Sequence, residues 1–236
     1  MQILSLSRSV VAVAAALAAV TAHADPVSLV KLTGLVGSAP AIGTAVYKAD
    51  LSTLAGSFAA IVIADNSSLL GGSPGQFSGF DLDAIKLSTT NCADAACASA
   101  APGMSLFNFV SGVIFAPGTQ RAPADAKLFG TGPAGNTLDN AVATLGLFDG
   151  VALTDASANG FISLGDNGSI AFNLTALTAS AGLFLYIGEV GDNGEVAASN
   201  IDLLRNPVPE PETYALLLGG LGVLGWAARR QRRVGR

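Results

Sequence analysis

The sequence predicts an all-β protein. We expect an antiparallel β-sandwich, jelly-roll-like in arrangement, between an N-terminal signal peptide and one C-terminal transmembrane helix. Short apolar stretches recur between Asp25 and Asn206, no convincing amphipathic helix separates them, and turn-forming dipeptides lie between them. About ten short strands in roughly 180 residues indicate one sandwich. The clearest stretches are 57–65, 79–88, 105–115, 159–175 and 182–195, and the dipeptides are Asp149-Gly150, Asn159-Gly160, Asn167-Gly168 and Asn193-Gly194.

Two of these stretches predict where their strands lie. In 169–175, Ile170, Phe172 and Leu174 alternate with smaller or polar residues, which predicts one core face and one wetter face. The stretch 105–115 is apolar on both faces, so we expect a strand near the middle of the sandwich.

A break in alternation occurs in 80–87, where Phe80 and Leu82 point one way and Ile85 and Leu87 the other. A bulge or bend near Asp83-Ala84 would keep all four side chains inward. Such a bend would place Asp81 and Asp83 at the rim of the sandwich, where paired carboxylates suit Ca²⁺. The alternative, which we favour, is that the two aspartates cover the outer face of an edge strand.

The N-terminus predicts export. Arg8 precedes an apolar run from Val10 to Val20, and the small residues Ala22 and Ala24 flank His23. This order of a basic region, an apolar region and a small-residue cleavage site is that of a secretory signal peptide. We therefore expect 1–24 to be removed, with cleavage after Ala24.

Charge and composition exclude several functions for the exported part. Between Asp25 and Glu212 there are 17 acidic residues and six basic ones, a net charge of −11, so nucleic-acid binding is not expected. His23, the only histidine, leaves with the signal peptide. Catalytic arrangements that use histidine are then excluded, and we predict that the protein is not an enzyme.

The two cysteines predict a single disulfide. Cys92 and Cys97 have four residues between them, and an exported protein meets an oxidising compartment. A zinc site would need two further ligands that neither cysteine nor histidine supplies. We expect a structural staple that closes a small loop, and no cofactor apart from a Ca²⁺ ion at Asp81 and Asp83.

The C-terminus combines three features. Pro209, Glu210 and Pro211 form an extended triplet, and an uncharged stretch follows at 213–228, short for a membrane-spanning helix and rich in glycine. A basic cluster then predicts a cytoplasmic end. Its arginines are Arg229, Arg230, Arg232, Arg233 and Arg236.

The triplet, the short apolar helix and the arginine cluster, in this order, resemble a PEP-CTERM sorting signal. The resemblance covers about 206–233 and implies a substrate of exosortase, a membrane peptidase of Gram-negative bacteria that make exopolysaccharide. It also implies cleavage at or near the triplet, after a transient stay in the inner membrane with the body in the periplasm. The implied destination is the cell surface or the extracellular matrix.

The predicted organisation is a signal peptide (1–24), an exported sandwich domain (25–206) and a sorting signal (207–236). We expect a non-enzymatic surface or matrix protein, associated with exopolysaccharide or biofilm. The alternative is a carbohydrate-binding module assisted by Ca²⁺, although the body offers only Tyr47 and Tyr186 and no tryptophan as sugar platforms. A hydrolase that uses carboxylates alone is the third hypothesis.

Overall fold

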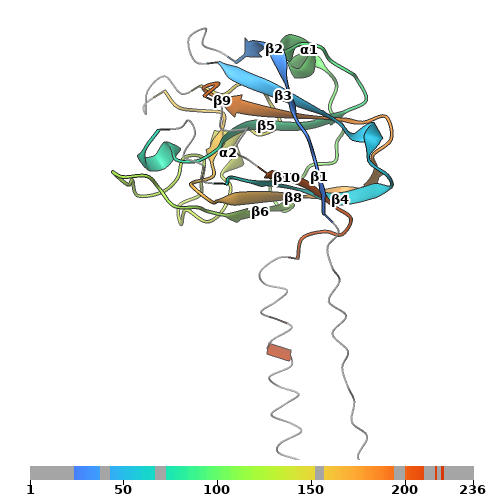
Figure 1. Ribbon diagram of the computed structural model, residues 1–236. Coiled ribbons are helices and arrows are strands. Elements are labelled where there is room, and N and C mark those ends of the chain that lie inside the picture. Colours follow the sequence, from blue (N-terminus) through green and yellow to red (C-terminus); the bar gives the residue numbers. More distant parts are fainter. Residues whose placement is uncertain are drawn as a thin grey trace, which may run out of the picture.

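The computed structural model describes residues 24–37, 43–66, 73–151, 157–193 and 200–209, together with Leu216, Gly219 and Gly220. Its ten described strands form two five-stranded sheets (Figure 1). In spatial order, sheet A consists of β1 (Ala24–Pro26), β10 (Asn200–Leu204), β4 (Ser57–Ala64), β8 (Ser169–Ala179) and β6 (Val113–Ala116). Sheet B consists of β2 (Val30–Val36), β3 (Thr44–Asp50), β9 (Phe184–Val190), β5 (Asp81–Ser88) and β7 (Ile162–Ser163).

All strand pairs in both sheets are antiparallel, so the predicted all-β class is confirmed. Among the described strands, only β2 and β3 follow one another within one sheet, and every other connection crosses to the opposite sheet. The finer prediction of a jelly roll stays a prediction. Four short helices complete the described elements: η1 (Leu51–Thr53), η2 (Gly75–Phe77), α1 (Ala95–Ala100) and α2 (Asn140–Ala143).

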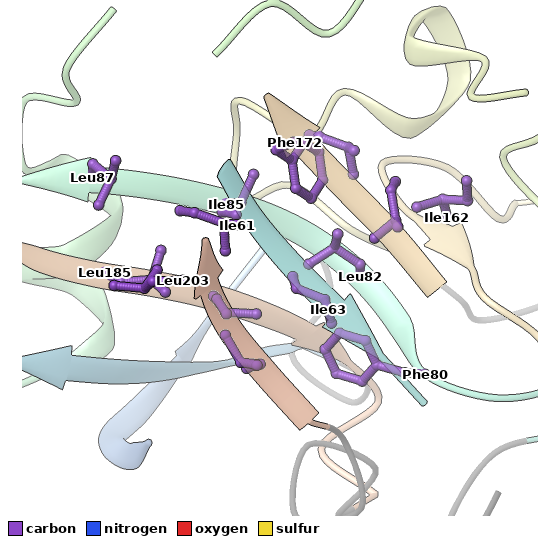
Figure 2. Packing of buried hydrophobic residues seen from close by; sticks show 14 of the residues in the cluster. Ile61, Ile63, Phe80, Leu82, Ile85, Leu87, Ile162, Phe172, Leu185 and Leu203 are labelled. Carbon is purple, nitrogen blue, oxygen red and sulfur yellow. The ribbon is translucent and has the colours of Figure 1, made fainter. Parts of the chain in front are cut away.

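The main core lies between the two sheets. Figure 2 shows Ile61 and Ile63 of β4 beside Leu82 and Ile85 of β5, with Phe172 of β8 in the same cluster. These five side chains are at most 2% exposed. The burial of such closely packed apolar side chains is the main stabilising contribution to a fold of two packed sheets.

The predicted bulge in β5 is confirmed. Leu82 pairs with Glu189 of β9 and Ile85 pairs with Ile187, so β5 uses three residues where β9 uses two. The extra residue restores the inward direction of both Leu82 and Ile85. The predicted alternation in β8 is also confirmed, since Phe172 is buried in the core and Thr175 is exposed.

The strand predicted for 105–115 is wrong over most of its length. The stretch forms a strand only from Val113, in β6, which is an edge of sheet A, apart from an isolated bridge between Phe107 and Leu174. The cause is Asn108, whose side-chain Oδ1 accepts hydrogen bonds from Val110 N and Ser111 N, while its carbonyl accepts one from Gly112 N. These bonds fold the segment into a turn, because an asparagine side chain offers the backbone an alternative to the sheet.

The turn-forming dipeptides suggest hairpins between neighbouring strands, and this expectation is wrong where the structure describes them. Asp149-Gly150, Asn159-Gly160 and Asn167-Gly168 do not join neighbouring strands of one sheet, because the chain crosses between sheets around them. Gly150 has a different role, since a Cβ atom there would lie 2.5 Å from Val190 Cγ2 and 3.0 Å from Asp83 Cγ. Glycine therefore lets the loop 144–150 approach sheet B closely.

Candidate functional site

The sorting segment meets the sandwich at one residue of β8. The amide of Asn173 donates from Nδ2 to Val208 O at 2.9 Å, and Asn173 Oδ1 accepts from Val208 N at 2.7 Å. Val208 is half-buried, whereas Pro207 and Pro209 on either side are exposed. The segment that precedes the Pro-Glu-Pro triplet is therefore hydrogen-bonded to sheet A.

The remaining predicted residues of the two chain ends lie outside the described part. These are Ala22, Glu210, Pro211, Arg229, Arg230, Arg232 and Arg233. Ala24 is the first residue of β1. The predicted span 213–228 is described only at Leu216, Gly219 and Gly220, and among all described residues no helix is long and apolar enough to cross a membrane.

The predicted rim position of Asp81 and Asp83 is wrong. Asp81 is 5% exposed and Asp83 is 0% exposed. Nor is β5 an edge strand, because it lies between β9 and β7. Both side chains point away from the main core, but other segments of the chain cover that face of sheet B.

Asp83 docks the loop 144–150 onto sheet B. Its Oδ1 accepts from Asp149 N at 3.2 Å and from Gly150 N at 3.1 Å, and Oδ2 accepts from Thr44 Oγ1. The bulge in β5 contributes to the docking of this loop, because Ile85 N donates a hydrogen bond to Leu145 O at 3.0 Å. Burial raises the pKa of Asp83 to about 7, against the opposing effect of its hydrogen bonds.

Asp81 makes a similar contact on the neighbouring strand, where its Oδ1 accepts from Ser163 Oγ of β7. The hydroxyls of Ser163 and Thr44 thus bind the two carboxyls that were predicted as calcium ligands. Within the described ranges, no three His, Cys, Asp or Glu side chains converge as a metal site. Calcium binding by this pair stays a prediction.

A second buried acid lies at the end of β9. Glu189 is 0% exposed, its Oε1 accepts from Asn193 N at 3.3 Å, and its Oε2 has no hydrogen-bond partner among the described residues. Burial raises its pKa to about 7, and Asp192 adds to this effect while Lys31 opposes it. Burial, together with Glu189 and Asp192, also raises the pKa of Tyr47 to about 12. The sequence did not indicate the burial of Glu189, because the polar residues and glycines that follow it are typical of a turn.

A shallow groove of about 380 Å³ lies beside β5. Phe107 and Phe109 stack on its wall with ring centroids 5.7 Å apart, and Lys86 contributes its aliphatic stem. The Lys86 ammonium is engaged elsewhere, since it donates to the carbonyls of Ala98, Ser99 and Ala101. The lining residues include no carboxylate, so the groove offers no basis for carboxylate catalysis.

The predicted disulfide is confirmed. Cys92 and Cys97 are joined with an S–S distance of 2.08 Å and a Cα–Cα distance of 5.5 Å. Asp94 caps the N-terminus of α1 inside this loop, because its Oδ1 accepts from Cys97 N at 2.7 Å. Tyr186 fixes the loop to sheet B by accepting from Cys92 N at 2.8 Å and donating to Thr90 O at 2.6 Å.

The described chain consists of two β-sheets followed by a proline-containing segment that is hydrogen-bonded to sheet A. Residues 207–233 match the family model described as the PEP-CTERM protein-sorting motif. Residues 207–233 therefore carry this sorting motif, which confirms the resemblance, and the motif indicates an exported protein sorted by exosortase. No curated protein and no solved structure matches the chain.

Proposed function

We propose that the chain is a non-enzymatic protein of the cell surface or extracellular matrix, released by exosortase cleavage at or near Pro209-Glu210-Pro211. The observation that carries this proposal is the match of 207–233 to the sorting motif. The proposed route is a transient stay in the inner membrane, with the sandwich in the periplasm, followed by transfer to the surface or the medium.

The character of the body supports a non-enzymatic role. From Asp25 to Asn206 the sequence holds no histidine, and the buried carboxyls Asp83 and Glu189 lie on opposite faces of sheet B. Asp83 is engaged in docking a loop rather than facing a cleft. We propose exopolysaccharide of the surrounding matrix as the partner, because the sorting motif is associated with bacteria that make it.

Substitution of the triplet tests the sorting proposal. We expect Pro209-Glu210-Pro211→Ala-Ala-Ala to keep the full-length protein in the inner membrane of a host that has exosortase. The matched control is Pro133→Ala, an exposed proline of the body, which we expect to be processed normally. Wild-type protein in a host without exosortase should also stay in the membrane. Unchanged release of the triple variant would refute the proposal.

Partner binding needs its own experiment. Calorimetry of the released protein against exopolysaccharide of the same host, with and without Ca²⁺, is expected to show heat of binding that does not depend on the ion. No heat in either condition would remove exopolysaccharide as a partner. Heat that requires Ca²⁺ and is lost in Asp83→Asn would favour the calcium-assisted alternative.

A further inference from the structure

The contact between Asn173 and Val208 has the form of a pair in an antiparallel ladder. One side-chain amide accepts from the N–H and donates to the C=O of the same residue, at 2.7 and 2.9 Å. Two strand residues opposite one another exchange their hydrogen bonds in the same manner. Asn173 therefore uses its side chain to hold Val208 as a strand would hold it.

The fold places Asn173 rigidly for this contact. Its own backbone is fixed, because it pairs with Ala60 of β4 and its N–H donates to Gly112 O at 2.7 Å. Leu204 of β10 also pairs with Ala60, so Leu204, Ala60 and Asn173 form one row across three strands of sheet A. The chain leaves β10 at Leu204, in this row, and meets the row again at Val208, which is hydrogen-bonded to Asn173.

The burial of Ala60 agrees with this path of the chain after β10. Ala60 is 0% exposed although it lies on the face of β4 that points away from the main core, since its neighbour Ile61 points inward. This burial is consistent with cover by the segment that leaves β10 at Leu204 and reaches Asn173 at Val208. The four residues between Leu204 and Pro209 run between the ends of this row, and Val208 is half-buried there.

The prolines make this single contact important for a peptidase. Proline has no N–H, so within 207–211 only Val208 and Glu210 carry a backbone donor. Extended peptides are commonly recognised through main-chain hydrogen bonds, as an added strand. Asn173 already occupies one of the two donors and the carbonyl of the same residue.

We propose that Asn173 is a latch that holds Val208, the residue before the Pro-Glu-Pro triplet, against sheet A, and that opening of this latch limits the rate of cleavage. The inference rests on the proposed processing by exosortase. Two neutral hydrogen bonds favour the closed state over the open state by a factor on the order of 10. Exosortase then acts on the minor, open population, whose fraction sets the observed rate.

The test is a pulse–chase measurement of the full-length chain in its host. We expect Asn173→Ala to shorten the half-time of conversion to the processed form about fivefold or more. Asn173→Asp keeps the shape and the acceptor but sets a carboxylate oxygen against Val208 O, so it should also accelerate processing. Thr175→Ala, an exposed position on the same face of β8, is the matched control and should be processed at the wild-type rate.

Asn173→Asp also covers the case in which Asn173→Ala does not fold. Processing of Asn173→Asp at the wild-type rate or more slowly would overturn the latch. The host without exosortase separates the two proposals. If wild-type protein is still processed there, the proposed function fails, whatever Asn173 does. If processing requires exosortase but ignores Asn173, the latch alone fails.

Hydrogen–deuterium exchange gives a second measurement that does not involve the peptidase. Val208 carries the only amide hydrogen of the tripeptide Pro207–Pro209, so its exchange can be assigned in the purified full-length chain. We expect exchange about 10-fold faster in Asn173→Ala than in the wild type, with Thr175→Ala unchanged. Equal rates in all three proteins would contradict the closed state.

Discussion

The outer faces of the two sheets differ in what covers them. On sheet B, α1 and the loop 144–150 bury a second apolar cluster, which includes Val46, Ala84, Phe148 and Tyr186. On sheet A, Thr175 is exposed and Leu177 is 67% exposed, and the segment after β10 makes its contact at Asn173. One face is covered by segments that are built into the fold, and the other holds a segment that, in our proposal, is later released.

The buried polar groups follow the same division. Asp83, Lys86 and Tyr186 all lie on the covered side of sheet B, and each binds backbone groups of a segment that packs there. Such groups are costly to leave unpaired, so they fix the covering segments firmly. The hydrogen bonds of Asn173 are fewer and half-buried, which suits a contact that opens.

Removal of the Lys86 ammonium should cause the largest loss of stability, because this group fixes a segment that covers the outer face of sheet B. Lys86→Met keeps most of the apolar stem but leaves the carbonyls of Ala98, Ser99 and Ala101 without their shared donor. It also removes a cation–π contact with Phe148 at 5.0 Å.

For Lys86→Met we expect a loss of about 3 kcal/mol in the free energy of unfolding, measured by chemical denaturation. Lys31→Met, which removes an exposed ion pair with Asp192, should lose less than about 1 kcal/mol. Equal losses in both variants would contradict this assignment.

The buried carboxyl of Asp83 should make stability depend on pH. Its folded-state pKa of about 7 lies above the ordinary value of 3.8, so the folded state holds the proton more tightly. The stability that Asp83 contributes is complete below about pH 4 and is lost as the pH rises to 7. Asp83→Asn keeps an acceptor for the two N–H groups and removes the charge. We expect a gain on the order of 2 kcal/mol at pH 8 and almost none at pH 4.

Denaturation at the two pH values checks this effect. Asp50→Asn is the control of opposite sign, because hydrogen bonds from Ser52 lower the pKa of Asp50. That variant should lose stability above pH 4. A pH profile of Asp83→Asn identical to that of the wild type would contradict the burial of an ionisable group at this position.

The open face of sheet A should tolerate substitution best. Leu177→Ala on this face is expected to change the free energy of unfolding by less than about 0.5 kcal/mol. Leu174→Ala, three residues earlier on β8 but facing the core, should cost at least about 2 kcal/mol. Thermal denaturation of the two variants gives the comparison. A large loss in Leu177→Ala would mean that this face is covered after all.

Local sequence patterns predicted the parts of the fold that depend on local geometry. The break in alternation between Leu82 and Ile85 has one economical solution, a bulge, and the structure contains it. The strand predicted for 105–115 failed because a single side chain, Asn108, diverts the backbone. Apolar periodicity carries no information about that hydrogen bond.

The surroundings of Asp83 were beyond local prediction for a different reason. The groups that bury it, Asp149 and Gly150, are more than 60 residues away in the chain. No pattern near Asp83 indicates that this loop returns to sheet B. The sorting motif, in contrast, lies within one short stretch of sequence, 207–233, so local patterns were sufficient to predict it.

Intact-mass spectrometry of the protein recovered from the cell surface or medium tests the central claim most directly. We expect one species that begins at Asp25 and ends between Asn206 and Pro211, with Cys92 and Cys97 oxidised. A recovered protein that still contains 213–236 would show that the sorting segment is retained, and would contradict release by cleavage at the triplet.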